Sequence, residues 1–296
     1  MDSWIISLRI FQTFFFTFIP MLLGYLIINT WHKKEIDFAI KVSIIICFLE
    51  YLLSLNMSVS NILRSFVDTD YANTNSSLLE SNTFPLLALG LFIYFCYYKK
   101  NIFFTVLSFV FVLITFKRVV MFTAIILFII SRLKLKDLRV SKICLLLSIF
   151  FILIISFSYF GVIEPQHILQ SSRYLNIDLR AFSTNRTDRL AWLDASNFVS
   201  YGFGSSTDFM YKTFGGLALE MDIVALVVEL GWISVVAFIT CYLRFAKGNF
   251  YVFVAMTLLL LNSIFSSGMS STFGWLIILV SMSSILVDSC DKKIGE

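Results

Sequence analysis

Two arginines and two carboxylates stand in one polar stretch of an otherwise apolar chain, and these residue types could handle a phosphorylated group. Arg186 and Arg189 are three positions apart, and Glu220 and Asp222 follow just before the sequence becomes apolar again. A guanidinium is planar and holds two oxygens of a phosphate at once, so a pair on adjacent turns of one helix face suits a diphosphate. A nearby carboxylate is a candidate acceptor for the proton of a reacting hydroxyl.

Each of these residues also has a purely structural interpretation. Arg186 and Arg189 could be solvated charges paired with Asp188 or Asp194. Asp222 stands where an apolar helix is expected to begin, and a carboxylate there often serves only as a cap, so cap and catalyst stay open. Glu220 lies further out and is the better candidate for a general base, because partial burial is expected to raise its pKa toward the working pH.

The rest of the chain has the composition of an integral membrane protein. Of its 296 residues, 58% are hydrophobic and 14% are charged, whereas soluble domains carry about 25% charged residues. Apolar runs approach the length that crosses a bilayer. We therefore predict an all-α polytopic membrane protein, a single integral membrane domain over residues 1–296. The nine expected spans are 8–30, 36–56, 83–98, 101–116, 118–131, 143–161, 222–242, 249–265 and 271–288.

Basic residues alternate between the connections of these spans, and this pattern predicts the orientation. Lysines and arginines gather in cytoplasmic loops of membrane proteins. The connections after the first, third, fifth and seventh spans are basic and are assigned to the inside. Their basic residues are His32, Lys33 and Lys34, then Lys99 and Lys100, then Arg132, Lys134, Lys136, Arg139 and Lys142, then Arg244 and Lys247. The segments expected outside, together with the N-terminus, are 57–82, 117–118, 162–221 and 266–270.

The largest outside segment, residues 162–221, is expected to be an extracytoplasmic loop with short helices. A helix should start near Thr187, with Asn185 as its cap and Asp188 in its first turn. Arg186 would then share a face with the second arginine of the pair. The expected packing residues are Leu190, Trp192 and Leu193, and the glycines expected to end this helix are Gly202 and Gly204.

Three charged residues outside this loop are further candidates for the site. Arg118 interrupts the apolar run ITFKRVVMF at a turn assigned to the outside, where a cation is expected to hold an anion. The alternative is that Lys117 and Arg118 simply make a tight turn. Arg64 and Glu80 lie in the other long outside segment.

Several classes of site and partner are not expected from this sequence. The sequence offers no Gly-rich phosphate loop and no cluster of residues at metal-ligand spacing, so neither a metal nor a cofactor is expected. The net charge of +4 is small and its basic residues sit in short clusters between apolar runs, which disfavours nucleic acid as a partner.

Four short segments follow one another in a recognisable order. They are Glu80-Ser81-Asn82, Phe116-Lys117-Arg118, Arg186-Thr187-Asp188…Trp192…Gly202-Phe203-Gly204 and Glu229-Leu230-Gly231. In these motifs and their order, the chain resembles the O-antigen polymerase/ligase superfamily, which includes the Wzy-type polysaccharide polymerases. The similar segments cover most of residues 57–240, with Ser81 where the family has Pro and two extra residues before Trp192. Ligases of this family carry a His where this chain has Glu220, and its absence favours a polymerase.

The resemblance implies a membrane glycosyltransferase that joins polyprenyl-diphosphate-linked oligosaccharide repeats of an O-antigen or capsule. It would act at the outer, periplasmic face of the plasma (bacterial inner) membrane, beside the flippase and chain-length regulator of the pathway. The alternatives are an O-antigen ligase with a lipid A-core acceptor and a flippase or transporter of the same lipid. The expected catalytic residues are Glu220, Asp222 and Arg186. The expected substrate-binding residues are Arg64, Glu80, Arg118, Arg186, Arg189 and Trp192.

Overall fold

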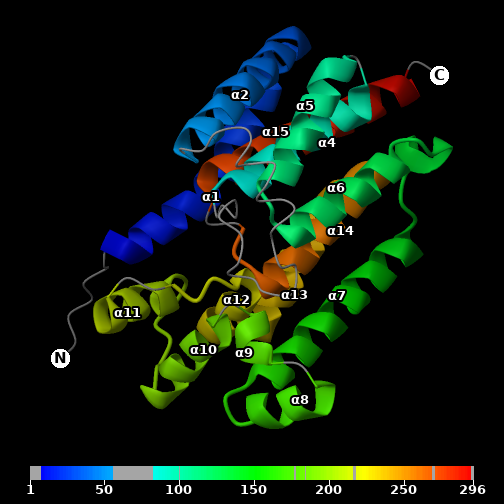
Figure 1. The fold of residues 1–296 in the computed structure, drawn as a ribbon. Helices are drawn as coiled ribbons and strands as arrows, with labels where there is room; N and C mark the ends of the chain where they lie inside the picture. Colours follow the sequence, from blue (N-terminus) through cyan, green and yellow to red (C-terminus); the bar gives the residue numbers. More distant parts are fainter. Residues whose placement is uncertain are drawn as a thin grey trace.

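The computed structural model describes residues 8–55, 83–99, 101–176, 178–183, 185–215, 218–268 and 271–294, and the regular elements of these residues are all helices (Figure 1). The all-α prediction is therefore confirmed for the described part of the chain. The candidate residues Arg64 and Glu80 lie outside the described residues.

Helices occupy the positions of the predicted spans, and most helix ends lie within a few residues of the predicted ones. They are α1 (Leu8–Thr30), α2 (Lys33–Ser54), α4 (Phe84–Tyr98), α5 (Ile102–Ile114), α6 (Arg118–Ile130), α7 (Lys142–Ile163), α12 (Asp222–Leu230), α13 (Trp232–Ala246), α14 (Phe250–Phe265) and α15 (Thr272–Ile294).

One predicted span is two helices instead of one. The expected span 222–242 is interrupted at Gly231, which has φ 77° and ψ 176° and so lies outside the helical region. Only glycine adopts this conformation readily, because a Cβ would clash with the backbone. The single continuous helix predicted there is therefore wrong, and α12 and α13 meet at a bend.

Three described helices are long and apolar enough to cross a membrane: Leu8–Thr30, Lys142–Ile163 and Thr272–Cys290. Five more are apolar but shorter, namely α4, α5, α6, α13 and α14. Helix α4 is apolar on all sides, and its residues from Pro85 to Tyr97 are buried between its neighbours. Gly90 lets α4 pack tightly on α15, since a Cβ there would stand 2.9 Å from the Ile278 backbone nitrogen.

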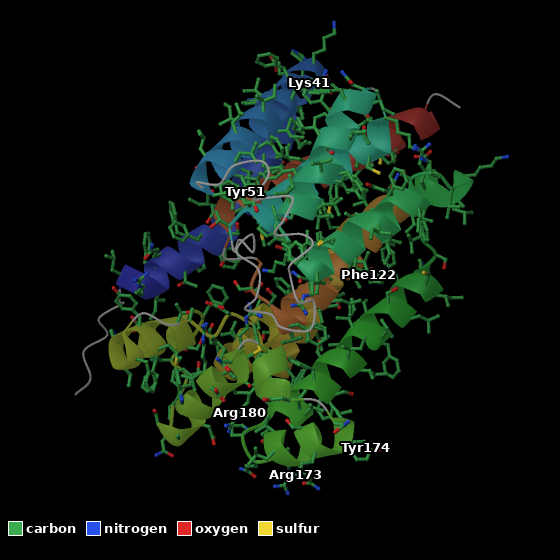
Figure 2. All side chains as sticks on the ribbon, in the orientation of Figure 1. Lys41, Tyr51, Phe122, Arg173, Tyr174 and Arg180 are labelled. Atoms are coloured by element: carbon green, nitrogen blue, oxygen red, sulfur yellow. The ribbon has the colours of Figure 1, made fainter. Side chains whose placement is uncertain are left out.

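The loops predicted to share the cytoplasmic side lie together at one end of the bundle. The Lys99 Nζ donates to the Ser131 carbonyl at 2.5 Å, and the Val140 N–H donates to the Lys247 carbonyl at 3.0 Å. A short 3-10 helix, η1 (Lys134–Asp137), belongs to this end. Figure 2 shows Lys41 toward this end and Arg173 and Arg180 at the opposite end.

The opposite end is covered by a layer of short helices, which are formed by described residues between 168 and 214. These are α8 (Ile168–Leu175), α9 (Leu179–Phe182), α10 (Arg186–Ala195) and α11 (Ser205–Phe214). They have a small core of their own, which joins α10, α11, the end of α7 and the start of α12. Its buried residues are Ile163, Leu190, Leu193, Met210, Leu219, Met221 and Val224.

The helix that carries the arginine pair differs in detail from the prediction. It begins at Arg186, but Asn185 has φ 60° and its side chain makes no capping hydrogen bond, so the predicted cap is wrong. It ends at Ala195, well before the two glycines expected to end it. Those glycines form the turn into α11 instead, and Gly204 has φ 82° and packs against Thr13 of α1.

Candidate functional site

A cavity of about 830 Å³ lies where the layer of short helices meets the bundle, and it draws charged residues from distant parts of the chain. One wall is formed by α1, which contributes Phe14, Phe16 and Phe18 together with polar residues such as Arg9 and Gln12. The other walls come from the turn before α6, the start of α10, the segment leading into α12, and the connection between α14 and α15. The charged lining residues are Arg9, Lys117, Arg186, Glu220, Asp222 and Glu229.

The two arginines predicted to act as a pair share one carboxylate. The Glu220 Oε2 lies 3.4 Å from the Arg186 Nε, and the Glu220 Oε1 lies 2.9 Å from the Arg189 Nη1. Both guanidiniums are largely buried, with side chains 16% and 15% exposed. The prediction that both lie on one face of a helix is therefore confirmed, and Glu220 joins them from 34 positions beyond Arg186.

The two arginines differ in how tightly they are held. Arg189 also donates to the Ala218 carbonyl at 2.5 Å, so it is fixed at both ends of a short segment. Arg186 makes longer contacts, including one of 3.5 Å to the Phe265 carbonyl. Arg186 lines the cavity, whereas the described lining does not include Arg189. Arg186 is thus the guanidinium available to a ligand, and Arg189 is its structural neighbour.

Glu220 is held in place by its backbone as well as by the arginines. Its φ of 53° is in the left-handed region, which is costly for a residue other than glycine. The residues on either side, Leu219 and Met221, are 1% and 0% exposed and anchor the segment in the small core. The Glu220 carboxylate itself is 36% exposed and lines the cavity.

The pKa of Glu220 moves in the direction opposite to our expectation. Burial by itself would raise the pKa of this carboxyl, but Arg189, by its hydrogen bond and charge, and then Arg186 together hold it below its ordinary value. The expectation of a raised pKa is therefore wrong, because the sequence indicated the burial but not the two ion pairs. Glu220 is ionised at neutral pH.

Asp222 connects two elements at the cavity wall. It is the first residue of α12, and its Oδ2 accepts a hydrogen bond of 2.6 Å from the Gly268 N–H in the connection between α14 and α15. The carboxylate therefore fixes the start of α12 relative to the end of α14. It lines the cavity beside Glu220.

Glu229 holds the glycine turn that precedes α11. Its carboxylate accepts from the Gly204 N–H at 2.6 Å, from the Ser206 N–H at 3.0 Å and from the Ser206 hydroxyl at 2.5 Å. The side chain is buried, at 8% exposure. A buried carboxylate with three donors at a helix N-terminus is well compensated. The Glu229-Leu230-Gly231 and Gly202-Phe203-Gly204 motifs are therefore in direct contact.

At the turn before α6, Lys117 lines the cavity in place of the predicted Arg118. Phe116 has φ 54° and is buried, and this backbone reverses the chain so that Lys117 lines the cavity at 9% exposure. Arg118, the first residue of α6, is exposed. The described lining of the cavity thus contains a cation from this turn, but it is Lys117 and not Arg118.

The predicted binding residue Trp192 is not among the described lining residues of the cavity, and neither are two other arginines of the short-helix layer, Arg173 and Arg180. Trp192 is 39% exposed and packs against Phe214, with ring centroids 5.4 Å apart. Arg180 pairs with Asp188 at 3.2 Å and its side chain is half exposed. Figure 2 shows Arg173 and Arg180 on the short-helix layer.

Sequence reasoning missed the contribution of α1. Arg9 lines the cavity, and its guanidinium stands 3.8 Å above the ring of Tyr211 in α11. Gln12 lines the cavity one turn later and accepts a hydrogen bond of 3.3 Å from Arg9. The signal was present, because Arg9 is a single charge at the start of a long apolar helix.

Within the described residues, no three His, Cys, Asp or Glu side chains are grouped so that they could hold a metal ion.

Comparison of the chain with family models, with curated proteins and with solved structures finds no match.

Proposed function

We propose that this protein is a membrane-embedded polysaccharide polymerase that joins polyprenyl-diphosphate-linked oligosaccharide repeats. The observation that supports it best is the convergence of Arg186, Lys117 and Glu220 on one cavity that is also lined by Phe14, Phe16 and Phe18. Such a cavity suits a substrate with a diphosphate group and a long hydrocarbon chain.

The membrane location is supported by the outer surface of the helices as well as by their composition. Helix α7 exposes large apolar side chains along much of its length, among them Ile143, Leu147 and Phe150 at 72%, 63% and 64% exposure. Phe122 of α6 is 60% exposed and is labelled in Figure 2. Soluble proteins rarely expose contiguous apolar surface on this scale, whereas lipid accommodates it. We place the short-helix layer outside the plasma membrane, opposite the end where the basic loops gather.

The reaction would proceed by glycosyl transfer. A hydroxyl of one repeat attacks the anomeric carbon of another, and the bond from that carbon to the diphosphate oxygen breaks. Arg186 and Lys117 neutralise the charge that develops on the diphosphate, and a donor placed in this way contributes roughly 3–4 kcal/mol to the lowering of the barrier. Glu220 accepts the hydroxyl proton, and Asp222 positions the segment that carries it.

The experiment is to reconstitute the purified protein in vesicles with a lipid-diphosphate-linked oligosaccharide and to separate the products by length. A polymerase gives a ladder of carrier-linked glycans. A ligase gives no ladder from this lipid but transfers a preformed glycan to a lipid A-core acceptor. A flippase gives no new glycosidic bond and instead moves the lipid to the other leaflet. Either of the last two results would replace the proposal.

A further inference from the structure

The carboxylate of Glu220 is divided between two arginines that have different surroundings. Its Oε1 contacts Arg189 at 2.9 Å, and Arg189 is further fixed by the Ala218 carbonyl at 2.5 Å. Its Oε2 contacts Arg186 at the longer distance of 3.4 Å, and both of these residues line the cavity. The contact with Arg189 is therefore the anchor, and the contact with Arg186 is the one that a ligand can exchange.

An anion in this cavity meets carboxylates as well as cations. The described lining holds three of each, and an anionic ligand that reaches Arg186 must compete with the Glu220 carboxylate already paired with it. Asp222 accepts from the Gly268 N–H, and Glu229 accepts from the Gly204 and Ser206 N–H groups. Glu220 is held by two guanidinium groups.

We propose that Glu220 is an intramolecular competitor for Arg186, and that a phosphate group of the substrate displaces its Oε2 from Arg186 while Arg189 keeps its Oε1. This inference rests on the proposed function and adds a step to it. The donor substrate must bind before the proton acceptor is released. A carboxylate engaged by two guanidiniums is a weak base, and one engaged by a single guanidinium is a stronger one.

The chemical step then follows in a fixed order. Arg186 exchanges the Glu220 oxygen for a phosphate oxygen of the donor. The freed Oε2 accepts the proton of the acceptor hydroxyl as that oxygen bonds to the anomeric carbon. The bond from the anomeric carbon to the phosphate oxygen breaks, and its electron pair leaves on the diphosphate bound to Arg186. The anchor at Arg189 keeps the carboxylate within reach throughout.

Binding of farnesyl diphosphate to the purified full chain in detergent, measured by titration calorimetry, tests this competition. We expect Glu220→Gln to bind farnesyl diphosphate about fivefold more tightly than the wild type, which is the contribution of a partly exposed ion pair. The same variant should be slower in glycosyl transfer, because the amide cannot accept the proton. The matched control is Asp188→Asn, which removes an equal charge from α10 but pairs with Arg180 away from the cavity.

A second variant is needed because Glu220→Gln could misfold at this position, where the backbone has a positive φ of 53°. Asparagine tolerates the left-handed region better than other non-glycine residues, so Glu220→Asn keeps the backbone while removing the charge. It should also bind more tightly, whereas loss of a merely structural residue would weaken binding. Unchanged or weaker binding by the folded variants would overturn the inference, as would equal tightening in Asp188→Asn.

The outcomes also separate the inference from the proposed function. Tighter binding by both Glu220 variants without any polymer ladder from the wild type would retain the competition and reject the polymerase. A ladder from the wild type together with unchanged binding in both variants would retain the polymerase and reject the competition. Failure of the wild type to bind farnesyl diphosphate would reject the competition for Arg186.

Discussion

Replacement of Arg186 by Gln should separate activity from stability more clearly than any other change in the cavity. The side chain is 16% exposed and lines the cavity, and its contacts with Glu220 and the Phe265 carbonyl are 3.4 and 3.5 Å long. Because the Glu220 carboxylate is 36% exposed, solvent screens their ion pair. We therefore assign it no more than about 1 kcal/mol of stability.

The effect on the reaction should be much larger than the effect on folding. If Arg186 stabilises the leaving diphosphate, removing its charge should slow glycosyl transfer by about 10²–10³-fold. A loss of about 1 kcal/mol in stability lowers the melting temperature by only about 2–4 °C. The assay measures initial rates of ladder formation in vesicles at matched amounts of folded protein, with thermal unfolding followed in the same preparations.

The matched control is Arg180→Gln. Arg180 belongs to the same layer of short helices, but its side chain is 50% exposed and pairs with Asp188 at 3.2 Å outside the cavity. This control should keep the wild-type rate to within about twofold, since surface substitutions of this kind change little. A folded Arg186→Gln protein at the wild-type rate, or equal losses in both variants, would contradict a role for Arg186 in the reaction.

Further expectations concern the supports of the cavity. Lys117→Gln should slow ladder formation at least about tenfold and Arg118→Gln should not, and equal rates in the two variants would contradict the assignment of the turn. Glu229→Gln should lower the free energy of unfolding by about 1–3 kcal/mol, because a weaker acceptor is left facing three buried donors. An unchanged free energy of unfolding in chemical denaturation would contradict this expectation. Gly204→Ala should cost about 1–2 kcal/mol at its positive φ, and an unchanged melting temperature would argue against a strained turn. The pKa of Glu220 in the folded protein lies below its ordinary value of 4.5. Its ion pairs therefore stabilise the fold above pH 4.5, and this stabilisation is lost as the pH falls through the folded pKa. Glu220→Asn should accordingly show a smaller drop in melting temperature on acidification than the wild type.

The positions of the long helices follow from the sequence because apolar runs alternate with short basic connections. The ends of α1, α4 and α7 lie within about two residues of the predicted spans. The bend at Gly231 was not predictable in the same way, since an isolated glycine in an apolar run is compatible with a continuous helix. Gly231, with its φ of 77°, joins two helices that both pack against α14.

The candidate site was predictable in its residue types but not in its pairing. Helical periodicity was enough to place Arg186 and Arg189 on one face. The choice between Lys117 and Arg118 depends on the positive φ of Phe116, which the sequence does not signal because Phe rarely adopts it. The lowered pKa of Glu220 likewise depends on contacts between segments far apart in the chain, which local patterns do not encode.

The most direct test of the account is to locate a bound lipid diphosphate. A polyprenyl diphosphate with a photoreactive group near its head is cross-linked to the protein in vesicles, and the labelled peptides are identified by mass spectrometry. We expect labels at Lys117, at the start of α10 and around Glu220, all reduced in Arg186→Gln. Labels concentrated instead at the other basic end of the bundle, around Lys99 and η1, would contradict it.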